Sequence, residues 1–226
     1  MKRKLEVVEK AKTRRRRYTL KDGRIAPGVT TVLDGLSKPA MLIWSNQIGL
    51  AGYELRKYVD ELASIGTLAH AMIERHLQGG FSEEDFPDFT RNQYERALVP
   101  FKKYVEWEKQ HSVEVILSEK PLVSEVFRFG GTADGILKID GIATLIDFKT
   151  SKAIYDEHLI QCAANTVLAE ENGYKVDAFR VLQIGRNADE GFSEKTVAYA
   201  EMEKYWMVFK GALDVYYAKK ALEGKL

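Results

Sequence analysis

The sequence predicts a mixed α/β fold in which a small central sheet lies between helices. Apolar residues recur at helical spacing in much of the segment from 53 to 110. From residue 113 the pattern changes to strand-like runs, and an Asp-Gly pair at 140–141 indicates a tight hairpin. Helical and strand-like segments then follow one another to the end of the chain. The expected order is helices, three strands, a helix, two strands and a closing helix.

The helices ahead of the sheet are expected to be N-terminal additions to it. Apolar positions from 53 to 77 repeat at helical spacing, with Gly66 as a candidate point of interruption. The segment 78–88 contains two glycines and a proline, which indicates a connection. Thr90 is a good N-cap for a second helix that extends to about Gln110.

The strands are expected in the middle and in the last third of the chain. Segments 113–117, 127–139 and 142–150 have strand-like patterns. Asp140-Gly141 would join the last two, because both central residues of a primed turn need a positive φ. The remaining expected elements are a helix at 157–171 that ends at Asn172-Gly173, strands at 176–184 and 196–200, and a helix at 201–222.

The composition is that of an ordinary globular protein, with 45% hydrophobic and 30% charged residues. The 34 basic and 33 acidic residues nearly cancel, which excludes a uniformly basic coat for nucleic acid but allows a local basic patch. The single cysteine, Cys162, excludes an internal disulfide, a zinc knuckle and a four-cysteine iron–sulfur site. The sequence lacks a secretory signal and an apolar run long enough for a membrane span, so we expect a cytoplasmic protein without a membrane partner.

Positive charge is concentrated at the N-terminus. Residues 1–17 hold nine basic and two acidic side chains. The segment ends in four consecutive arginines, Arg14, Arg15, Arg16 and Arg17. Like charges in a block resist packing, so we expect 1–17 to be a flexible basic arm and 18–226 to form a single domain. The arm is either a solvated segment without a partner or a segment that binds phosphates of nucleic acid.

Two aspartates are expected to face each other across the hairpin. Asp134 and Asp147 lie equally far from the centre of the Asp140-Gly141 turn, so without a bulge they are direct cross-strand neighbours. Side chains alternate along a strand, so Lys149 shares a side with Asp147 while Phe148 points into the core. Two apposed carboxylates repel each other, and a divalent cation such as Mg²⁺ or Mn²⁺ would remove that repulsion.

Lys149 completes a set of groups that suits phosphodiester hydrolysis. A metal flanked by carboxylates lowers the pKa of a bound water, and a nearby ammonium can orient that water and hold the phosphate. The alternative is a solvated ion pair between Asp147 and Lys149, which a bare Asp-x-Lys tripeptide usually forms. The opposed Asp134 and the adjacent glycines favour the metal site.

Several short motifs occur in a fixed order along the chain. They are Gly66-Thr67-Leu68-Ala69-His70 followed by Glu74, then Glu119, Gly131-Thr132-Ala133-Asp134, Ile146-Asp147-Phe148-Lys149-Thr150 and Gln161. In this order and spacing they resemble the PD-(D/E)XK nuclease superfamily, in its RecB-like and phage exonuclease branch. The resemblance covers roughly residues 27–185. It implies a restriction-endonuclease-like mixed sheet core flanked by helices.

The resemblance implies a role for each matching residue. The catalytic residues would be Asp134, Asp147, Lys149 and Gln161. The ligands of Mg²⁺, for which Mn²⁺ would substitute, would be His70, Asp134, Asp147 and the backbone carbonyl of Phe148, with Glu74 and Glu119 in support. The expected DNA contacts are Arg14, Arg15, Arg16, Arg17, Lys152 and Tyr155.

The chain departs from the family pattern in two ways. RecB-like members usually carry tyrosine four residues after the glutamine, where this chain has Asn165, and Tyr155 is a candidate replacement. The cysteines of the iron–sulfur branch are absent, which excludes that branch and a cluster.

Other aromatic residues and histidines allow two interpretations. His76 lies on the opposite side of its helix from His70 and is expected to be structural. Trp44, Tyr58 and Tyr94 are expected to pack in the core, and base stacking is the alternative.

The function expected from these observations is that of a Mg²⁺-dependent DNA nuclease. An exonuclease that acts on DNA ends or single strands in phage-type recombination, repair or processing fits the resemblance best. A structure-specific endonuclease and a non-catalytic nucleic-acid-binding module on the same fold are the alternatives. The intact Asp134, Asp147 and Lys149 argue against the module. A recombination partner protein or a homo-oligomer is a candidate partner, and a phage-encoded protein would act in the cytoplasm of its bacterial host.

Overall fold

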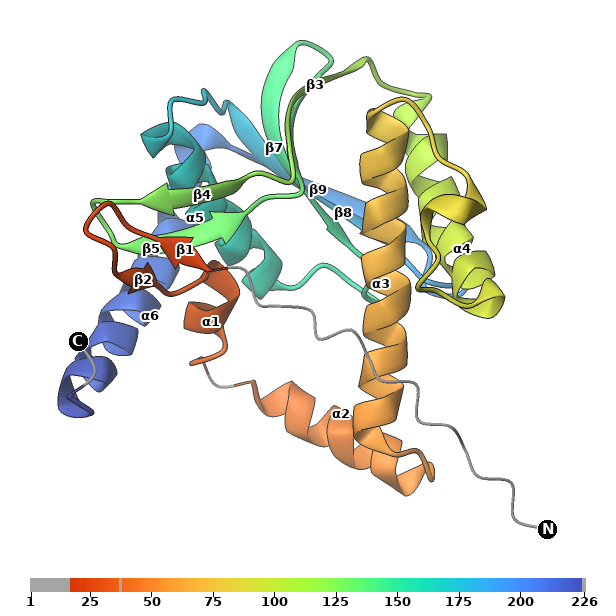
Figure 1. Cartoon of the computed structure of the whole chain (residues 1–226), viewed down its shortest axis with the longest axis horizontal. Coiled ribbons are helices and arrows are strands. Elements are labelled where there is room, and N and C mark those ends of the chain that lie inside the picture. The colour runs from red at the N-terminus through yellow and green to blue at the C-terminus, as the bar shows by residue number, and fades with distance from the viewer. Residues whose placement is uncertain (1–16, 37, 225–226) are drawn as a thin grey trace.

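The structure, a computed structural model, describes residues 17–36 and 38–224 (Figure 1). The expected basic arm therefore lies outside the described residues, except for Arg17, which is exposed and precedes the first strand. None of the helices in the described segments is both long and apolar enough to cross a membrane.

A five-stranded mixed sheet forms the centre of the fold. Its strands are β3 (Val113–Ser118), β6 (Gly135–Ile139), β7 (Ile142–Lys149), β8 (Ala178–Ile184) and β9 (Phe192–Ala198), in the spatial order β3-β6-β7-β8-β9. The pair β7 and β8 is parallel, and the other neighbouring pairs are antiparallel. The parallel pair needs a crossover connection, which α5 (Asp156–Glu171) provides.

Two helices cover each face of this sheet (Figure 1). On one face α3 (Leu55–Leu77) and α4 (Arg91–Glu108) pack through Ile73, Tyr104 and Trp107 onto Ile146 and Phe148. On the other face α5 and α6 (Glu203–Leu222) pack through Leu159, Ala163 and Phe209 against Leu145 and Val181. The alternation along β7 thus sends Phe148 to the α3 side and leaves Asp147 and Lys149 on the α5 side.

The remaining elements are short. They are β1 (Tyr18–Thr19), β2 (Ile25–Ala26), α1 (Val29–Leu33), α2 (Pro39–Leu50), η1 (Glu83–Asp85), β4 (Pro121–Ser124), β5 (Phe129–Thr132) and η2 (Tyr199–Glu201). Of these, α1, β4 and β5 contact α5, and η1 lies in the connection between α3 and α4. Strands β1 and β2 pair with each other, and β4 pairs with β5. In Figure 1, α2 and the first half of α3 project from the sheet and its covering helices.

The predicted mixed α/β class, with a restriction-endonuclease-like sheet flanked by helices, is confirmed. The predicted N-cap is also confirmed, because the Thr90 hydroxyl accepts a hydrogen bond from the Gln93 backbone N–H at the start of α4. Gly66 does not interrupt α3, which is continuous over 23 residues. The expected C-terminal end of α5 is confirmed by Gly173, whose φ is +86°.

The hairpin register is the one expected from the sequence. Gly135 pairs with Ile146 and Ile139 with Ile142, around a turn in which Asp140 and Gly141 both have positive φ. Asp134 lies one residue ahead of the paired part of β6.

Two expectations about strands are corrected, and one further strand was not predicted. The single strand expected at 127–139 is two strands, β5 and β6, in two different sheets, because the chain turns at Ala133 and Asp134. The strand expected at 196–200 begins earlier, at Phe192, since it pairs along the whole of β8. Strand β4 was not expected at all, because its four residues show no alternation long enough to detect.

Candidate active site

The hairpin brings the two predicted carboxylates together. Oδ2 of Asp134 accepts a hydrogen bond of 2.6 Å from the backbone N–H of Phe148. This bond continues the β6–β7 ladder beyond Gly135 with a side chain in place of a backbone carbonyl. The Asp134 carboxylate is thereby fixed at the end of β7, beside Asp147.

Asp147 and Lys149 form a buried ion pair on the α5 side of β7. Nζ of Lys149 lies 2.7 Å from Oδ2 of Asp147, and Asp147 is only 2% exposed. The expected alternative, a solvated surface pair, is therefore wrong. Burial raises the pKa of Asp147 to about 6; Lys149 acts against that rise and the charge of Asp134 adds to it.

Helix α5 holds the lysine from its other side. Nζ of Lys149 donates a hydrogen bond of 3.2 Å to Oε1 of Gln161. Burial alone would lower the pKa of Lys149, but Asp147 and Asp134 outweigh it and raise that pKa. The lysine is therefore a fixed ammonium group between a carboxylate and an amide oxygen.

Helix α3 brings His70 to Asp134 from the opposite face of the sheet. Nδ1 of His70 lies 3.3 Å from Oδ1 of Asp134, and the imidazole packs edge-on against the Phe148 ring. Burial alone would lower the pKa of His70, but the Asp134 carboxylate raises it. Burial alone would raise the pKa of Asp134, but the charges of His70 and Lys149 and the Phe148 N–H lower it. The structure thus brings together His70, Asp134, Asp147, Lys149 and Gln161.

The chemistry of these donors fits a small divalent cation. Oδ2 of Asp147 is buried and makes no hydrogen bond of acceptable geometry, although it lies beside the Lys149 ammonium. Mg²⁺ is commonly held by one or two carboxylates and several waters, so Asp134, Asp147 and the Phe148 carbonyl form a sufficient donor set. Within residues 17–36 and 38–224, no three His, Cys, Asp or Glu side chains are grouped as a metal site.

The two glutamates expected to support the site, Glu119 and Glu74, make different contacts. The backbone N–H of Glu119 donates a hydrogen bond of 3.2 Å to the carbonyl oxygen of Asp134, and Glu119 has a left-handed φ of +46°. Glu119 is therefore beside Asp134 through its backbone. Oε1 of Glu74 accepts a hydrogen bond from the Gln78 side chain, one turn further along α3. That contact turns Glu74 along the surface of the helix.

Two of the expected DNA contacts, Lys152 and Tyr155, lie on the surface, whereas Asn165, at the position where tyrosine is usual, is buried. Lys152 and Tyr155 are exposed in the segment between β7 and α5, next to the site. Tyr155 precedes α5 and donates its backbone N–H to Nδ1 of His158. Asn165 is buried, and its side chain lies where a Cβ on Gly131 would fall, so Asn165 is a packing residue. It cannot contact DNA in this conformation.

Sequence reasoning missed Gln183, a buried residue of β8 that pairs with Lys149 in the sheet. Its Nε2 donates hydrogen bonds to the carbonyl oxygens of Ser151, at 2.7 Å, and of Glu190, at 2.9 Å. Its Oε1 accepts a hydrogen bond from Ser193. Gln183 therefore holds the chain that leaves Lys149. A signal was present, because a glutamine between Leu182 and Ile184 in a mostly apolar strand needs buried hydrogen-bond partners.

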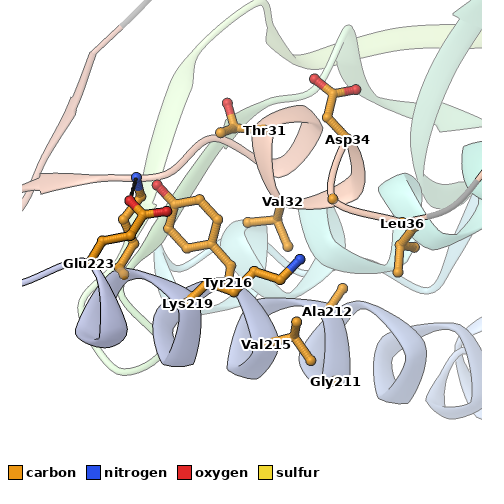
Figure 2. Close-up of a pocket in the computed structure, with 12 residues that line it drawn as sticks. Thr31, Val32, Asp34, Leu36, Gly211, Ala212, Val215, Tyr216, Lys219 and Glu223 are labelled. Carbon is orange, nitrogen blue, oxygen red and sulfur yellow. Dashed lines mark hydrogen bonds and ion pairs between the residues drawn. The ribbon is translucent and has the colours of Figure 1, made fainter. Parts of the chain in front are cut away.

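Two pockets lie away from these residues. A pocket of about 420 Å³ lies between α1 and α6. Figure 2 shows Thr31 and Asp34 on one wall and Val215, Tyr216 and Lys219 on the other. A second pocket, of about 940 Å³, lies beside it between β1, β2 and α1 and shares Thr31, Asp34 and Tyr216 with it. Neither is lined by any of the five residues gathered at the hairpin.

Comparison with known proteins gives a likeness of fold. No protein-family model matches the sequence, and no curated protein matches it. The crystal structure of a candidate exonuclease from Eubacterium rectale superposes with a TM-score of 0.50 at 13% identity, over 72% of this chain and 69% of the other. An alkaline exonuclease from Laribacter hongkongensis has a TM-score of 0.37 at 13% identity, over 88% of this chain and 94% of the other. At such low identity, the first likeness supports the fold of the core.

Proposed function

We propose that this protein is a Mg²⁺-dependent DNA nuclease with a PD-(D/E)XK active site, and that it acts as an exonuclease. The observation that carries the proposal is the set of Asp134, Asp147 and Lys149 at the end of the β6–β7 hairpin, in which Asp147 is buried and the other two are half-buried. Withdrawing three neighbouring charged groups from water, one fully and two in part, costs free energy, and a purely structural role gives no reason to keep all three. Groups with strongly perturbed surroundings of this kind are typical of active sites.

Each residue has a chemical task in this proposal. Asp134 and Asp147, with the Phe148 carbonyl, would hold Mg²⁺, and His70 would either join them or orient Asp134. When bound, Mg²⁺ would supply Lewis-acid stabilisation of negative charge on the phosphate. Lys149 would donate hydrogen bonds to the attacking water or to a phosphate oxygen, because its ammonium has three donors.

Gln161 would be a positioning residue for Lys149. Its amide oxygen accepts one of the three ammonium protons and leaves the others for Asp147 and the substrate. A held ammonium needs no reorganisation when charge develops in the transition state, which is the main advantage of a preorganised site.

The exonuclease mode and the cellular role belong to the proposal as well. The exonuclease assignment is supported by the motif resemblance and by a fold like that of the Eubacterium rectale candidate exonuclease. A role in phage-type recombination or repair, a recombination partner, a homo-oligomer and a cytoplasmic location remain predictions from the sequence.

One experiment tests the proposal directly. Linear DNA and covalently closed circular DNA are incubated with the protein and Mg²⁺, with EDTA and Mn²⁺ as parallel conditions. We expect linear DNA to be degraded with Mg²⁺ or Mn²⁺ and both DNAs to survive in EDTA. Degradation of the closed circle would indicate an endonuclease, and undiminished cleavage in EDTA would refute the metal-dependent mechanism.

A further inference from the structure

Helix α2 and the residues after it form an exposed apolar surface. From Pro39 to Tyr53 the sequence has no charged residue, although 30% of the whole chain is charged. No residue of α2 is buried, and Leu42 is 76% and Leu50 79% exposed. A helix without charged residues and with large apolar side chains such as these normally buries them inside a protein. This surface is therefore expected to meet another molecule.

Three aromatic rings gather where α2 meets the start of α3. The ring centroids of Trp44 and Tyr58 are 6.1 Å apart, and those of Tyr53 and Tyr58 are 5.5 Å apart. Tyr53 is 58% exposed, and Trp44 and Tyr58 are half-buried. The expectation that Trp44 and Tyr58 pack in the core is therefore wrong. We call these three residues the aromatic cluster.

The segment that carries the cluster is attached at both ends to the edge of the candidate active site. Ahead of α2, Nζ of Lys38 lies 2.8 Å from Oε1 of Glu157, in the first turn of α5. Further along α3, Gly66 approaches Thr150, the residue after Lys149. The first contact is with the start of α5, and the second is with the residue that follows Lys149. These two contacts position the cluster relative to the site.

We propose that the aromatic cluster is a stacking surface for unpaired bases of the DNA strand whose phosphates occupy the candidate active site. The proposal rests on the nuclease function proposed above. Base faces are apolar and uncharged, as the segment 39–53 is, and stacking on aromatic rings accepts any base. A surface without charge has no means of holding the phosphates, which would remain with Lys149 and Lys152.

The length of α3 sets the number of nucleotides between the two places. Tyr58 and His70 are on the same helix, about 18 Å apart at the usual helical rise. A stacked strand advances about 3.4 Å per nucleotide, so about five nucleotides separate the cleaved bond from the stacked base. Strands of about four nucleotides would not reach the cluster, and strands of about twelve would.

Binding of fluorescently labelled single strands in EDTA tests the proposal without cleavage. We expect Trp44→Ala and Tyr58→Ala to weaken binding of a strand of about twelve nucleotides roughly 10-fold each and to leave a strand of about four unaffected. Tyr58→Phe should bind like the wild type, because stacking needs the ring and not the hydroxyl. Leu42→Gln, on the same helix, and Tyr199→Ala, an exposed tyrosine elsewhere, are matched controls and should change neither strand.

The outcomes separate this proposal from its rivals. Unchanged binding of the longer strand by both alanine variants would overturn it. If those variants bind normally while Leu42→Gln abolishes self-association or association with a protein, the surface is a protein interface and the proposal is also overturned. If the cluster variants lose binding but the wild type cleaves no DNA with Mg²⁺, the stacking surface stands and the nuclease function fails.

Discussion

A Cβ atom on Gly66 of α3 would lie 2.7 Å from Oγ1 of Thr150, closer than real side chains approach. Helix α3 and the end of β7 therefore meet at a distance that only glycine allows. His70 follows Gly66 by about one helical turn, so this close approach sets how near its imidazole lies to Asp134.

Gly66→Ala should move α3 away from β7 and thereby separate His70 from Asp134. We expect a clear loss of nuclease activity, on the order of 10-fold or more, because small displacements of catalytic groups are costly to the rate. Stability should fall by about 1 to 3 kcal/mol as a result of overpacking. Cleavage of linear DNA with Mg²⁺ and thermal unfolding measure the two effects.

Two further variants identify the cause. Gly211 is also helical but faces open space, so Gly211→Ala should be neutral or stabilise by about 0.5 to 1 kcal/mol. Thr150→Ala removes the oxygen that the new methyl group would meet, so Gly66→Ala with Thr150→Ala should recover much of the lost activity. A double variant as inactive as the single one would contradict the steric explanation.

Lys149→Met should separate catalysis from metal binding. The variant removes a positive charge from beside Asp147, so affinity for Mg²⁺ should stay the same or increase. Cleavage should still fall on the order of 10²-fold or more, because the fixed ammonium is lost. Calorimetry with Mg²⁺ and single-turnover cleavage of linear DNA measure these quantities.

The same variant should also lose stability when no metal is present. Without the ammonium, the buried Asp147 carboxylate lacks its cation, and loss of one partner of a buried pair typically costs about 3 to 5 kcal/mol. Added Mg²⁺ should restore more stability to Lys149→Met than to the wild type, since a ligand of the folded state stabilises it. Asp147→Asn is the matched control, in which Mg²⁺ should have little effect. A Lys149→Met protein that cleaves at the wild-type rate would disprove the assignment of this strand.

The two histidines of α3 should give opposite results. Nδ1 of His70 faces Asp134, whereas Nε2 of His76 lies 2.6 Å from Oε2 of Glu108 on α4. His70→Ala should lose cleavage activity with a small change in stability. His76→Ala should retain activity and lose about 0.5 to 1.5 kcal/mol, because a half-buried hydrogen bond between two helices is broken. Equal activity losses in the two variants would remove the distinction between site and scaffold.

The hairpin and its two aspartates could be predicted because local rules determine them. An Asp-Gly turn fixes the register, and a register fixes which side chains face each other. The partnership of Lys149 with Gln161 needed more than local rules, since α5 must first pack on the sheet. Here only the resemblance in motif order pointed to it, and the structure adds the 3.2 Å hydrogen bond.

The features that escaped prediction depend on contacts between distant segments. Gly66 was interpreted as a possible helix interruption. The contact that requires a glycine there is with the Thr150 hydroxyl, which lies far away in sequence. The prediction that Trp44 packs in the core is wrong, because the described chain leaves every residue of α2 at least partly exposed. Sequence patterns report how apolar a segment is, but not whether this chain supplies the surface that covers it.

His158 should make the protein less stable in mild acid. Burial, with a smaller contribution from the positive charge of Lys149, lowers the pKa of His158 from 6.5 to about 4. The free Nδ1 of the neutral ring accepts the Tyr155 backbone N–H, so protonation at Nδ1 would break this bond. Between pH 6.5 and about 4 the unfolded chain binds a proton that the folded protein excludes, so the free energy of unfolding decreases as the pH falls through this range.

His158→Asn tests this explanation, because the asparagine side-chain oxygen can accept the Tyr155 N–H but does not titrate. We expect the variant to match the wild type above pH 6.5 and to lose less stability than the wild type between pH 6.5 and about 4. Denaturant unfolding at several pH values gives the two slopes, and NMR titration of the ring gives the pKa directly. A His158 pKa near the ordinary 6.5, or parallel slopes for the two proteins, would show that acid acts elsewhere in the fold.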